Sequence, residues 1–378
     1  MNHTTNPFIV KAYLSKELFC DRENELNVLH RNFNNGINTT IISPRKMGKS
    51  GLIHRFFDDL NFEKDLASVY IDIYATLSLK DFIKHIAEAI MKRFPEKTKT
   101  GRAFMKFLKS LRPVISFDPF TGQPQIQINF QTEYESAHTI QNLFQFLDAQ
   151  NIKIICAFDE FQQISKYPEK NVEALLRTHI QSLKNVFFIF CGSNKSMMSE
   201  IFTSANRPFF ASTRLLYLDK IETTAYKKFI QHHFGINGKQ ISEEAIESVL
   251  FWTKRHTFYT QTLCNVLFSM HHNKVSVESV KEAMSEILTE NEPYFFQYRQ
   301  FLTPAQWNYL IAVAKEEEVT QITSQKFISK YHIGTPANSK RIMKSLLEKE
   351  LILEILSEKE TCYRIYDVFF GRWLQTNF

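Results

Sequence analysis

The feature that most constrains the fold is a β-branched run followed by a glycine-lysine-serine tripeptide and an amphipathic helix pattern. Residues 39–43 predict a strand, and the apolar spacing after Ser50 predicts a helix. Between them lies Ser43-Pro44-Arg45-Lys46-Met47-Gly48-Lys49-Ser50. Where a strand leads through a loop into the N-terminus of a helix, backbone N–H groups point inward and can hold phosphate. The segment therefore predicts a phosphate-binding loop.

The residue types in this loop have distinct expected roles. Gly48 would let the backbone approach the phosphates, Lys49 would reach the β- and γ-phosphates, and Ser50 would ligate Mg²⁺. The predicted nucleotide-binding residues are Ser43, Pro44, Arg45, Lys46, Met47, Gly48, Lys49, Ser50 and Gly51. A solvated basic turn would explain the tripeptide alone, so the interpretation needs support from elsewhere in the chain.

A second motif gives that support. Residues 153–158 form an apolar run without alternation, as expected of a strand buried on both faces, and Asp159-Glu160 follow it. Asp159 would hold Mg²⁺ through water, and Glu160 would polarise an attacking water molecule. The alternative interpretation of the acidic pair is a helix N-cap. Because the two motifs occur together on two predicted strands, we expect nucleotide binding.

Two further positions are candidates for catalysis. Residues 186–191 predict another buried strand, which ends in Gly192-Ser193-Asn194. Ser193 or Asn194 could sense the γ-phosphate, and a simple turn is the alternative. Arg207, on an expected loop, could neutralise transition-state charge within one subunit or across two, or be a surface arginine without a catalytic role. The expected catalytic residues are Lys49, Glu160, Asn194 and Arg207.

The order of the patterns predicts the architecture. Strands alternate with helices through residues 1–219, which predicts an α/β fold with a parallel sheet between helices, interrupted by a β-hairpin at residues 112–130. Asp21 is the expected N-cap of the first helix. Residues 220–300 have a helical pattern. Residues 301–378 predict short helices followed by a hairpin, the order of a winged helix.

Composition excludes several classes of protein. The 378 residues contain five scattered cysteines without a Cys-x-x-Cys pair, so a disulfide framework and a cysteine zinc site are disfavoured. No apolar run is long enough to span a bilayer, and the polar N-terminus lacks the apolar core of a signal peptide. We therefore expect a cytoplasmic protein without membrane contact. The net charge of +6 permits nucleic-acid binding but does not argue for it.

Taken together, these features resemble the AAA-related P-loop ATPases of the signal-transduction (STAND) branch, and within it the archaeal-type ATPase family that is also found in bacteria. The resemblance covers nearly the whole chain. Besides the motifs above, it rests on residues 19–26, on Arg207-Pro208-Phe209-Phe210, on Phe258-Tyr259-Thr260-Gln261 and on residues 363–370. It implies an ATPase core, an α-helical lid, a C-terminal winged helix, ATP with Mg²⁺, and hydrolysis used as a conformational switch.

This sequence departs from the family pattern at two places. Ser43 replaces the usual first glycine of the loop, which could distort it. Arg255-His256-Thr257 replaces a lid segment that often reads Gly-x-Pro, which puts nucleotide sensing by the lid in doubt. Arg255 is either a substitute phosphate sensor or a solvated helix residue. The resemblance also places Cys20-Asp21-Arg22 near the adenine edge.

The third helix of the expected winged helix carries a polar stripe that could bind double-stranded DNA: Asn338, Lys340, Arg341 and Lys344. Residues 320–378 hold nine Lys and Arg against six Asp and Glu, which is less basic than is usual for DNA-reading domains. The expected wing tip, at residues 357–360, is acidic. Docking on a protein partner, on another copy or within the chain is therefore an equal alternative.

The sequence as a whole favours an ATP-hydrolysing molecular switch that couples its nucleotide state to the winged helix. Intact Lys49, Ser50, Asp159 and Glu160 are the observations behind this hypothesis. The alternative is a nucleotide-gated DNA-binding regulator or scaffold without significant hydrolysis. A small-molecule kinase is disfavoured because no arginine-rich lid follows the acidic pair.

Overall fold

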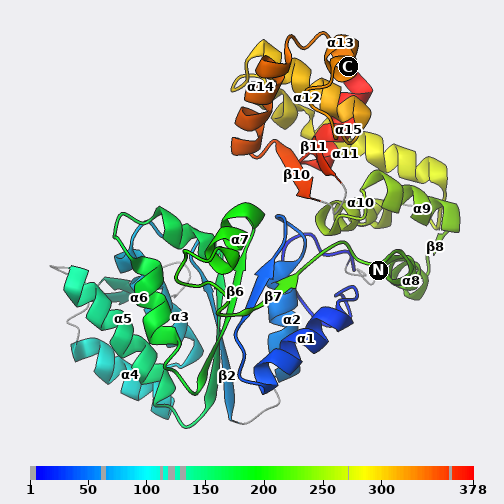
Figure 1. Ribbon diagram of the computed structural model, residues 1–378. Coiled ribbons are helices and arrows are strands. Elements are labelled where there is room, and N and C mark those ends of the chain that lie inside the picture. The colour runs from blue at the N-terminus through cyan, green and yellow to red at the C-terminus, as the bar shows by residue number, and fades with distance from the viewer. Residues whose placement is uncertain are drawn as a thin grey trace. The chain divides into compact units, whose positions relative to one another are not determined.

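The computed structural model describes residues 6–60, 65–110, 114–117, 124–127, 133–270, 272–356 and 360–378. The chain divides into two compact units (Figure 1). The first comprises residues 11–220, and the second joins the N-terminal segment up to Val10 to residues 221–378. The predicted domain boundaries at 219 and 300 stay predictions.

The first unit is built on a five-stranded parallel sheet. Its strands are β1 (Thr39–Ile42), β2 (Leu66–Asp72), β5 (Lys153–Asp159), β6 (Val186–Gly192) and β7 (Arg214–Tyr217). Their order is β2-β5-β6-β1-β7, and each neighbouring pair is parallel. The predicted α/β class is confirmed. Because β6 lies between β5 and β1, the carboxyl ends of these three strands meet at one edge of the sheet.

Helices cover both faces of the sheet (Figure 1). One face is covered by α1 (Glu23–Asn34) and α2 (Lys49–Leu60), and the odd-numbered residues of β5 are buried there. The other face is covered by α3 (Leu79–Arg93), α5 (Glu133–Asp148) and α6 (Val172–Ile180), and the even-numbered residues of β5 are buried there. On the second face, Phe158, Phe188 and Phe190 stack with ring centroids 5.8 to 6.1 Å apart. Burial on both faces explains why these strands lack alternation.

Several smaller elements complete the first unit. The strands β3 (Val114–Phe117) and β4 (Pro124–Gln127) pair antiparallel, which confirms a hairpin inside residues 112–130. Of the predicted hairpin, residues 112–113, 118–123 and 128–130 lie outside the described residues. Sequence patterns did not predict α4 (Lys99–Ser110), the 3₁₀ helix η1 (Phe161–Lys166) or α7 (Lys195–Thr203).

The expected N-cap of α1 is wrong. Arg22, not Asp21, precedes the helix, and it makes no side-chain cap hydrogen bond. Asp21 and Arg22 both have left-handed backbone conformations, with φ of 57° and 77°. An N-cap residue normally has an extended backbone, so the turn at Asp21 and Arg22 excludes the expected capping geometry.

Four helices form the first part of the second unit: α8 (Thr223–Ile236), α9 (Glu243–Trp252), α10 (Thr257–Ser269) and α11 (Val277–Tyr298). The short strands β8 (Gln240–Ile241) and β9 (Lys274–Val275) pair between them. The N-terminal segment packs on these helices. Asn6 Nδ2 donates to the Asn265 carbonyl at 2.9 Å, Asn265 Nδ2 donates to the Phe8 carbonyl at 2.7 Å, and the buried Phe8 ring contacts Phe234 and Phe268.

The second part has the predicted order of a winged helix. Its elements are α12 (Pro304–Glu316), α13 (Gln325–Tyr331), α14 (Pro336–Glu348), β10 (Ile352–Leu356), β11 (Thr361–Ile365) and α15 (Val368–Asn377). An isolated bridge between Val319 and Tyr363 extends the hairpin. Of the predicted wing tip, residues 357–359 lie outside the described residues. Sequence patterns did not predict α15.

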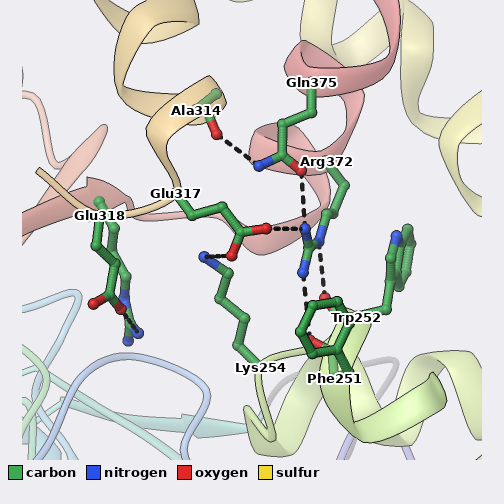
Figure 2. Close-up of polar contacts among 9 residues, drawn as sticks. Phe251, Trp252, Lys254, Ala314, Glu317, Glu318, Arg372 and Gln375 are labelled. Carbon is green, nitrogen blue, oxygen red and sulfur yellow. Dashed lines mark hydrogen bonds and ion pairs between the residues drawn. The ribbon is translucent and has the colours of Figure 1, made fainter.

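One arginine joins the two parts of this unit (Figure 2). The Arg372 guanidinium, from α15, donates to the Trp252 carbonyl at 3.1 Å and the Phe251 carbonyl at 3.4 Å, both at the end of α9. It also forms an ion pair with Glu317 at 2.7 Å, and Lys254 lies 3.4 Å from the other Glu317 oxygen. Burial opposes ionisation of Glu317, but the two cations lower its pKa. Arg372 therefore caps α9 from outside the helix.

None of the helices in the described part of the chain has the length and apolar content that crossing a lipid bilayer demands.

Candidate functional site

The predicted phosphate loop lies at the carboxyl end of β1. Lys46 and Gly48 adopt left-handed conformations, with φ of 61° and 95°, and the chain then enters α2 at Lys49. The first backbone N–H groups of a helix have no acceptor within the helix and carry partial positive charge. The start of α2 is therefore suited to binding phosphate oxygens.

The loop holds the Lys49 ammonium close to its own backbone. The Lys49 side chain is buried, and Nζ donates to the Pro44 carbonyl at 3.1 Å and the Ser43 carbonyl at 3.4 Å. Ser43 is also buried, and its φ lies outside the left-handed region. Met47 packs in the core, whereas Arg45 and Lys46 are exposed. The site therefore presents one buried cation to an incoming phosphate.

Ser50 and Asp159, the two residues predicted to hold Mg²⁺, are in contact. Ser50 Oγ donates to Asp159 Oδ2 at 2.7 Å, which leaves the lone pairs of Oγ available to a cation. Hydroxyl and carboxylate oxygens are ligands that suit Mg²⁺, which usually takes its remaining ligands from phosphates and water. Within the described residues, no three His, Cys, Asp or Glu side chains gather to form a metal cage. The donor set therefore fits Mg²⁺ bound together with a nucleotide.

Two donors that sequence analysis missed hold the Asp159 carboxylate. The Tyr70 hydroxyl, from β2, donates to Oδ2, and the Cys191 thiol, from β6, lies 2.9 Å from Oδ1. Burial, and then the charge of Asp159, raise the pKa of both Tyr70 and Cys191, so both stay protonated donors at neutral pH. Only the strand order indicates this contact, because β5 lies between β2 and β6.

Glu160 is held by residues from two elements. Its backbone is left-handed, with φ of 57°. Its Oε2 accepts from Ser193 Oγ at 2.7 Å and from Gln162 Nε2 at 2.5 Å. Glu160 makes no side-chain cap on η1, which argues against capping as the reason for the acidic pair. Sequence analysis missed Gln162, because a glutamine two residues after an acidic pair is not a recognisable signal.

Asn194 and Arg207 make other contacts. Asn194 Oδ1 accepts from the Met197 backbone N–H at 3.0 Å and caps α7, so Ser193 is the residue of this pair that reaches Glu160. Arg207 forms ion pairs with Glu173 at 2.6 Å and Glu200 at 3.6 Å. Burial raises the pKa of Glu173, and Arg207 opposes that effect. Catalytic roles for Asn194 and Arg207 stay predictions.

The two other arginines that the family resemblance singled out are also engaged. Arg22 is buried and donates to the Asp219 carbonyl at 2.5 Å and to Glu25 at 2.7 Å, which ties the segment before α1 to the segment after β7. Arg255 has a left-handed backbone and donates to Thr223 Oγ1 at 2.8 Å. Their predicted proximity to a nucleotide stays a prediction.

The polar stripe of the winged helix lies on α14. Lys340, Arg341 and Lys344 are exposed there, and Asn338 is half-buried and accepts from Arg341 at 3.1 Å. The opposite side of α14 is apolar and packs into the core through Ile342, Met343 and Leu346. The predicted polar stripe therefore lies on the side of α14 that faces away from the core.

Two family models match the chain. One, described as "ATPase domain predominantly from Archaea", matches residues 19–254, more than half of the chain. The other, described as "Probable winged helix domain", matches residues 293–376. The first spans the phosphate loop, the acidic pair and the end of β6. No curated protein matches the sequence.

Solved structures share the fold across nearly the whole chain. A Walker-type ATPase of Pyrococcus abyssi is 17% identical with a TM-score of 0.66, over 98% of this chain and 99% of that one. The Aeropyrum pernix ORC2 protein with ADPNP and ADP is 13% identical with a TM-score of 0.58, over 98% of this chain and 98% of that one. The Aeropyrum pernix ORC1 protein in complex with DNA is 12% identical with a TM-score of 0.53, over 95% of this chain and 93% of that one.

At these identities, the likeness to solved structures shows the fold alone, and the family model carries the assignment. The chain belongs to the family of ATPase domains found predominantly in Archaea, and it ends in a winged-helix region.

Proposed function

We propose that this ATPase binds ATP together with Mg²⁺ at the edge where β1, β5 and β6 end, and uses hydrolysis as a conformational switch. The 2.7 Å contact between Ser50 and Asp159 carries the proposal, because it brings the phosphate loop to the acidic strand. The buried Lys49 cation and the start of α2 supply the positive charge that a triphosphate requires. The ADPNP and ADP complexes of the Aeropyrum pernix ORC2 protein support a nucleotide site in this fold.

In this proposal the residues have separate roles. Lys49 and the loop backbone bind the β- and γ-phosphates, and Ser50 and Asp159 hold Mg²⁺, which neutralises phosphate charge when bound. Glu160 takes one proton from water as the water oxygen bonds to the γ-phosphorus. The bond from that phosphorus to the bridging oxygen then breaks, which releases ADP and inorganic phosphate. The proton stays on Glu160 until solvent removes it.

Two substitutions test these roles. Lys49→Ala should weaken ATP binding at least about 10-fold, because it removes a charged donor from the phosphates. Glu160→Gln should keep ATP affinity and lower turnover about 100- to 10,000-fold, because it removes the proton acceptor. Both are measured by fluorescent-nucleotide titration and by phosphate release with Mg²⁺. Lys80→Ala, which removes an exposed lysine of α3, is the control and should change neither quantity.

The outcomes separate the proposal from its alternative. Unchanged ATP affinity in Lys49→Ala would contradict the site assignment. Hydrolysis retained by Glu160→Gln would move the role of water activation to another residue. If ATP binds but neither the wild-type protein nor the variants turn it over, the nucleotide-gated regulator or scaffold becomes the better account.

We also propose that nucleotide state is coupled to the winged helix, whose exposed basic residues on α14 contact DNA. The observation in support is the stripe of Lys340, Arg341 and Lys344, which faces solvent opposite an apolar packing face. The ORC1 structure in complex with DNA supports DNA as the partner, although its likeness to this chain extends to the fold alone. Docking on a protein stays the alternative.

A further inference from the structure

The geometry points to Gln162 as a positioning residue that orients the Glu160 carboxylate for water activation, in a space that Gly192 leaves open. This inference rests on the proposed role of Glu160 in ATP hydrolysis. It concerns three residues at the ends of two adjacent strands: Glu160 and Gln162 follow β5, and Gly192 ends β6.

Two side-chain donors converge on one oxygen of Glu160. Gln162 Nε2 and Ser193 Oγ both donate to Oε2, at 2.5 and 2.7 Å. Among the described residues, none makes a hydrogen bond to Oε1. An ionised carboxylate can only accept hydrogen bonds, so the Gln162 amide must direct its Nε2 rather than its Oε1 toward Glu160. Because both donors occupy Oε2, Oε1 is left as the oxygen that can accept a proton from water.

The carbonyl oxygen of the Gln162 amide is in an unfavourable position, which indicates that the glutamine is retained for its Nε2 donor. The Gln162 side chain is 7% exposed, and its Oε1 is buried without a hydrogen-bond partner among the described residues. A buried acceptor left unpaired destabilises a fold, and such groups are few in native proteins. An apolar side chain would fill the same space without that cost. The requirement for Nε2 beside Glu160 explains the glutamine.

Gly192 provides the room for this amide. A Cβ atom on Gly192 would lie 2.0 Å from Gln162 Oε1 and 2.6 Å from Met198 Sδ. The φ of Gly192 lies outside the left-handed region, so backbone conformation does not require a glycine there. A glycine is required because any side chain would clash with Gln162 and Met198. The end of β6 therefore contributes twice, through the Ser193 hydroxyl and through the missing side chain at Gly192.

The backbone of Glu160 completes the arrangement. Its φ of 57° is unfavourable for a residue with a side chain, and it ends β5 abruptly before η1. Because of that turn, Gln162 follows Glu160 by only two residues and still reaches its carboxylate. The turn at Glu160 and the space at Gly192 allow the Gln162 amide to hold one oxygen of the Glu160 carboxylate. A general base needs such support to keep its orientation.

The test uses Gln162→Met, which keeps the length and removes the donor. We expect kcat for ATP hydrolysis to fall about 10- to 100-fold, with KM and ATP affinity unchanged within about 2-fold. Gly192→Ala should show the same fall in kcat with KM again unchanged, since its Cβ atom displaces the amide while every polar group near Glu160 keeps its identity.

Gln163→Met is the matched control. Gln163 is similarly buried, at 9% exposure, but its Nε2 donates to the Thr76 carbonyl at 2.9 Å. Its substitution should leave kcat and KM unchanged. Wild-type kcat in Gln162→Met would overturn the inference, and so would a rise in kcat, which would mean that the amide restrains Glu160.

The proposed function is tested separately by Lys49→Ala and Glu160→Gln. If those two variants behave as expected and Gln162→Met does not, the inference fails and the proposed function stands. Turnover retained by Glu160→Gln overturns the inference and moves the role of water activation to another residue, whereas the proposed binding and hydrolysis of ATP stand. Should Gln162→Met not fold, Gln162→Asn keeps the amide but shortens its reach by one methylene group. Wild-type kcat in that variant would equally overturn the inference.

Discussion

Ser43 lies where related phosphate loops usually have their first glycine. A glycine is required where the backbone is left-handed or where a Cβ atom would clash. Ser43 has neither problem, because its φ lies outside the left-handed region and its hydroxyl donates to the Pro44 carbonyl at 3.1 Å. Lys46 and Gly48 make the left-handed turns of this loop instead. The serine is therefore compatible with the loop.

We accordingly predict that Ser43→Gly leaves ATP affinity within about 3-fold of wild type. It should also lower the free energy of unfolding by about 0.5–1 kcal/mol, because glycine gives the unfolded chain more conformational freedom. Nucleotide titration and urea unfolding followed by circular dichroism measure the two quantities. Tighter ATP binding by about 10-fold or more would show that Ser43 does distort the loop.

The chemistry of this site could be predicted at the residue scale only in part. Lys49, Ser50, Asp159 and Glu160 belong to patterns in which residue type, spacing and a preceding strand all agree. The residues around them carry no such pattern. Tyr70 and Cys191 reach Asp159 only because the strand order brings β2 and β6 to either side of β5. Side-chain contacts between strands depend on that order, which local periodicity does not encode.

At the scale of elements, the end of α9 depends on a residue from another helix. The last carbonyl groups of a helix have no partner within the helix. Here the Arg372 guanidinium, from α15, donates to two of these carbonyls and also pairs with Glu317. Hydrophobic periodicity predicts α9 as a helix. It does not predict the partner of its last turn, which lies 120 residues away at Arg372.

We predict that Arg372→Ala lowers the free energy of unfolding of the second unit by about 2–4 kcal/mol, because two carbonyl groups and a carboxylate lose a buried charged partner. Trp252, Trp307 and Trp373 are the protein's three tryptophans and all lie in this unit, so tryptophan fluorescence during urea unfolding reports on it alone. Lys344→Ala removes an 80% exposed lysine from a 3.9 Å ion pair with Glu348 and should leave the free energy of unfolding almost unchanged. Equal losses in both variants would contradict the proposed cap.

At the scale of the whole molecule, the chain passes twice between its two units, near residues 10 and 220. The N-terminal segment belongs to the second unit because Asn6 and Phe8 contact α10 across more than 250 residues of sequence. The alternation of strands and helices predicts the sheet unit well. It does not predict where an irregular N-terminal segment packs, because a few loop residues carry neither periodicity nor a motif.

The partner of the winged helix is the prediction that concerns the whole molecule. If α14 contacts DNA phosphates, Lys340→Ala/Lys344→Ala should weaken duplex binding of every sequence, and the slope of log affinity against log salt should fall by about 2. Fluorescence anisotropy at several salt concentrations, with ATP and with ADP, measures this. Lys80→Ala/Lys92→Ala removes two exposed lysines of α3 and is the charge-matched control. If both double variants reduce the slope of log affinity against log salt equally, the attraction between protein and DNA is unspecific. If duplex binding by the wild-type protein does not depend on salt, docking of the winged helix on a protein becomes the better account.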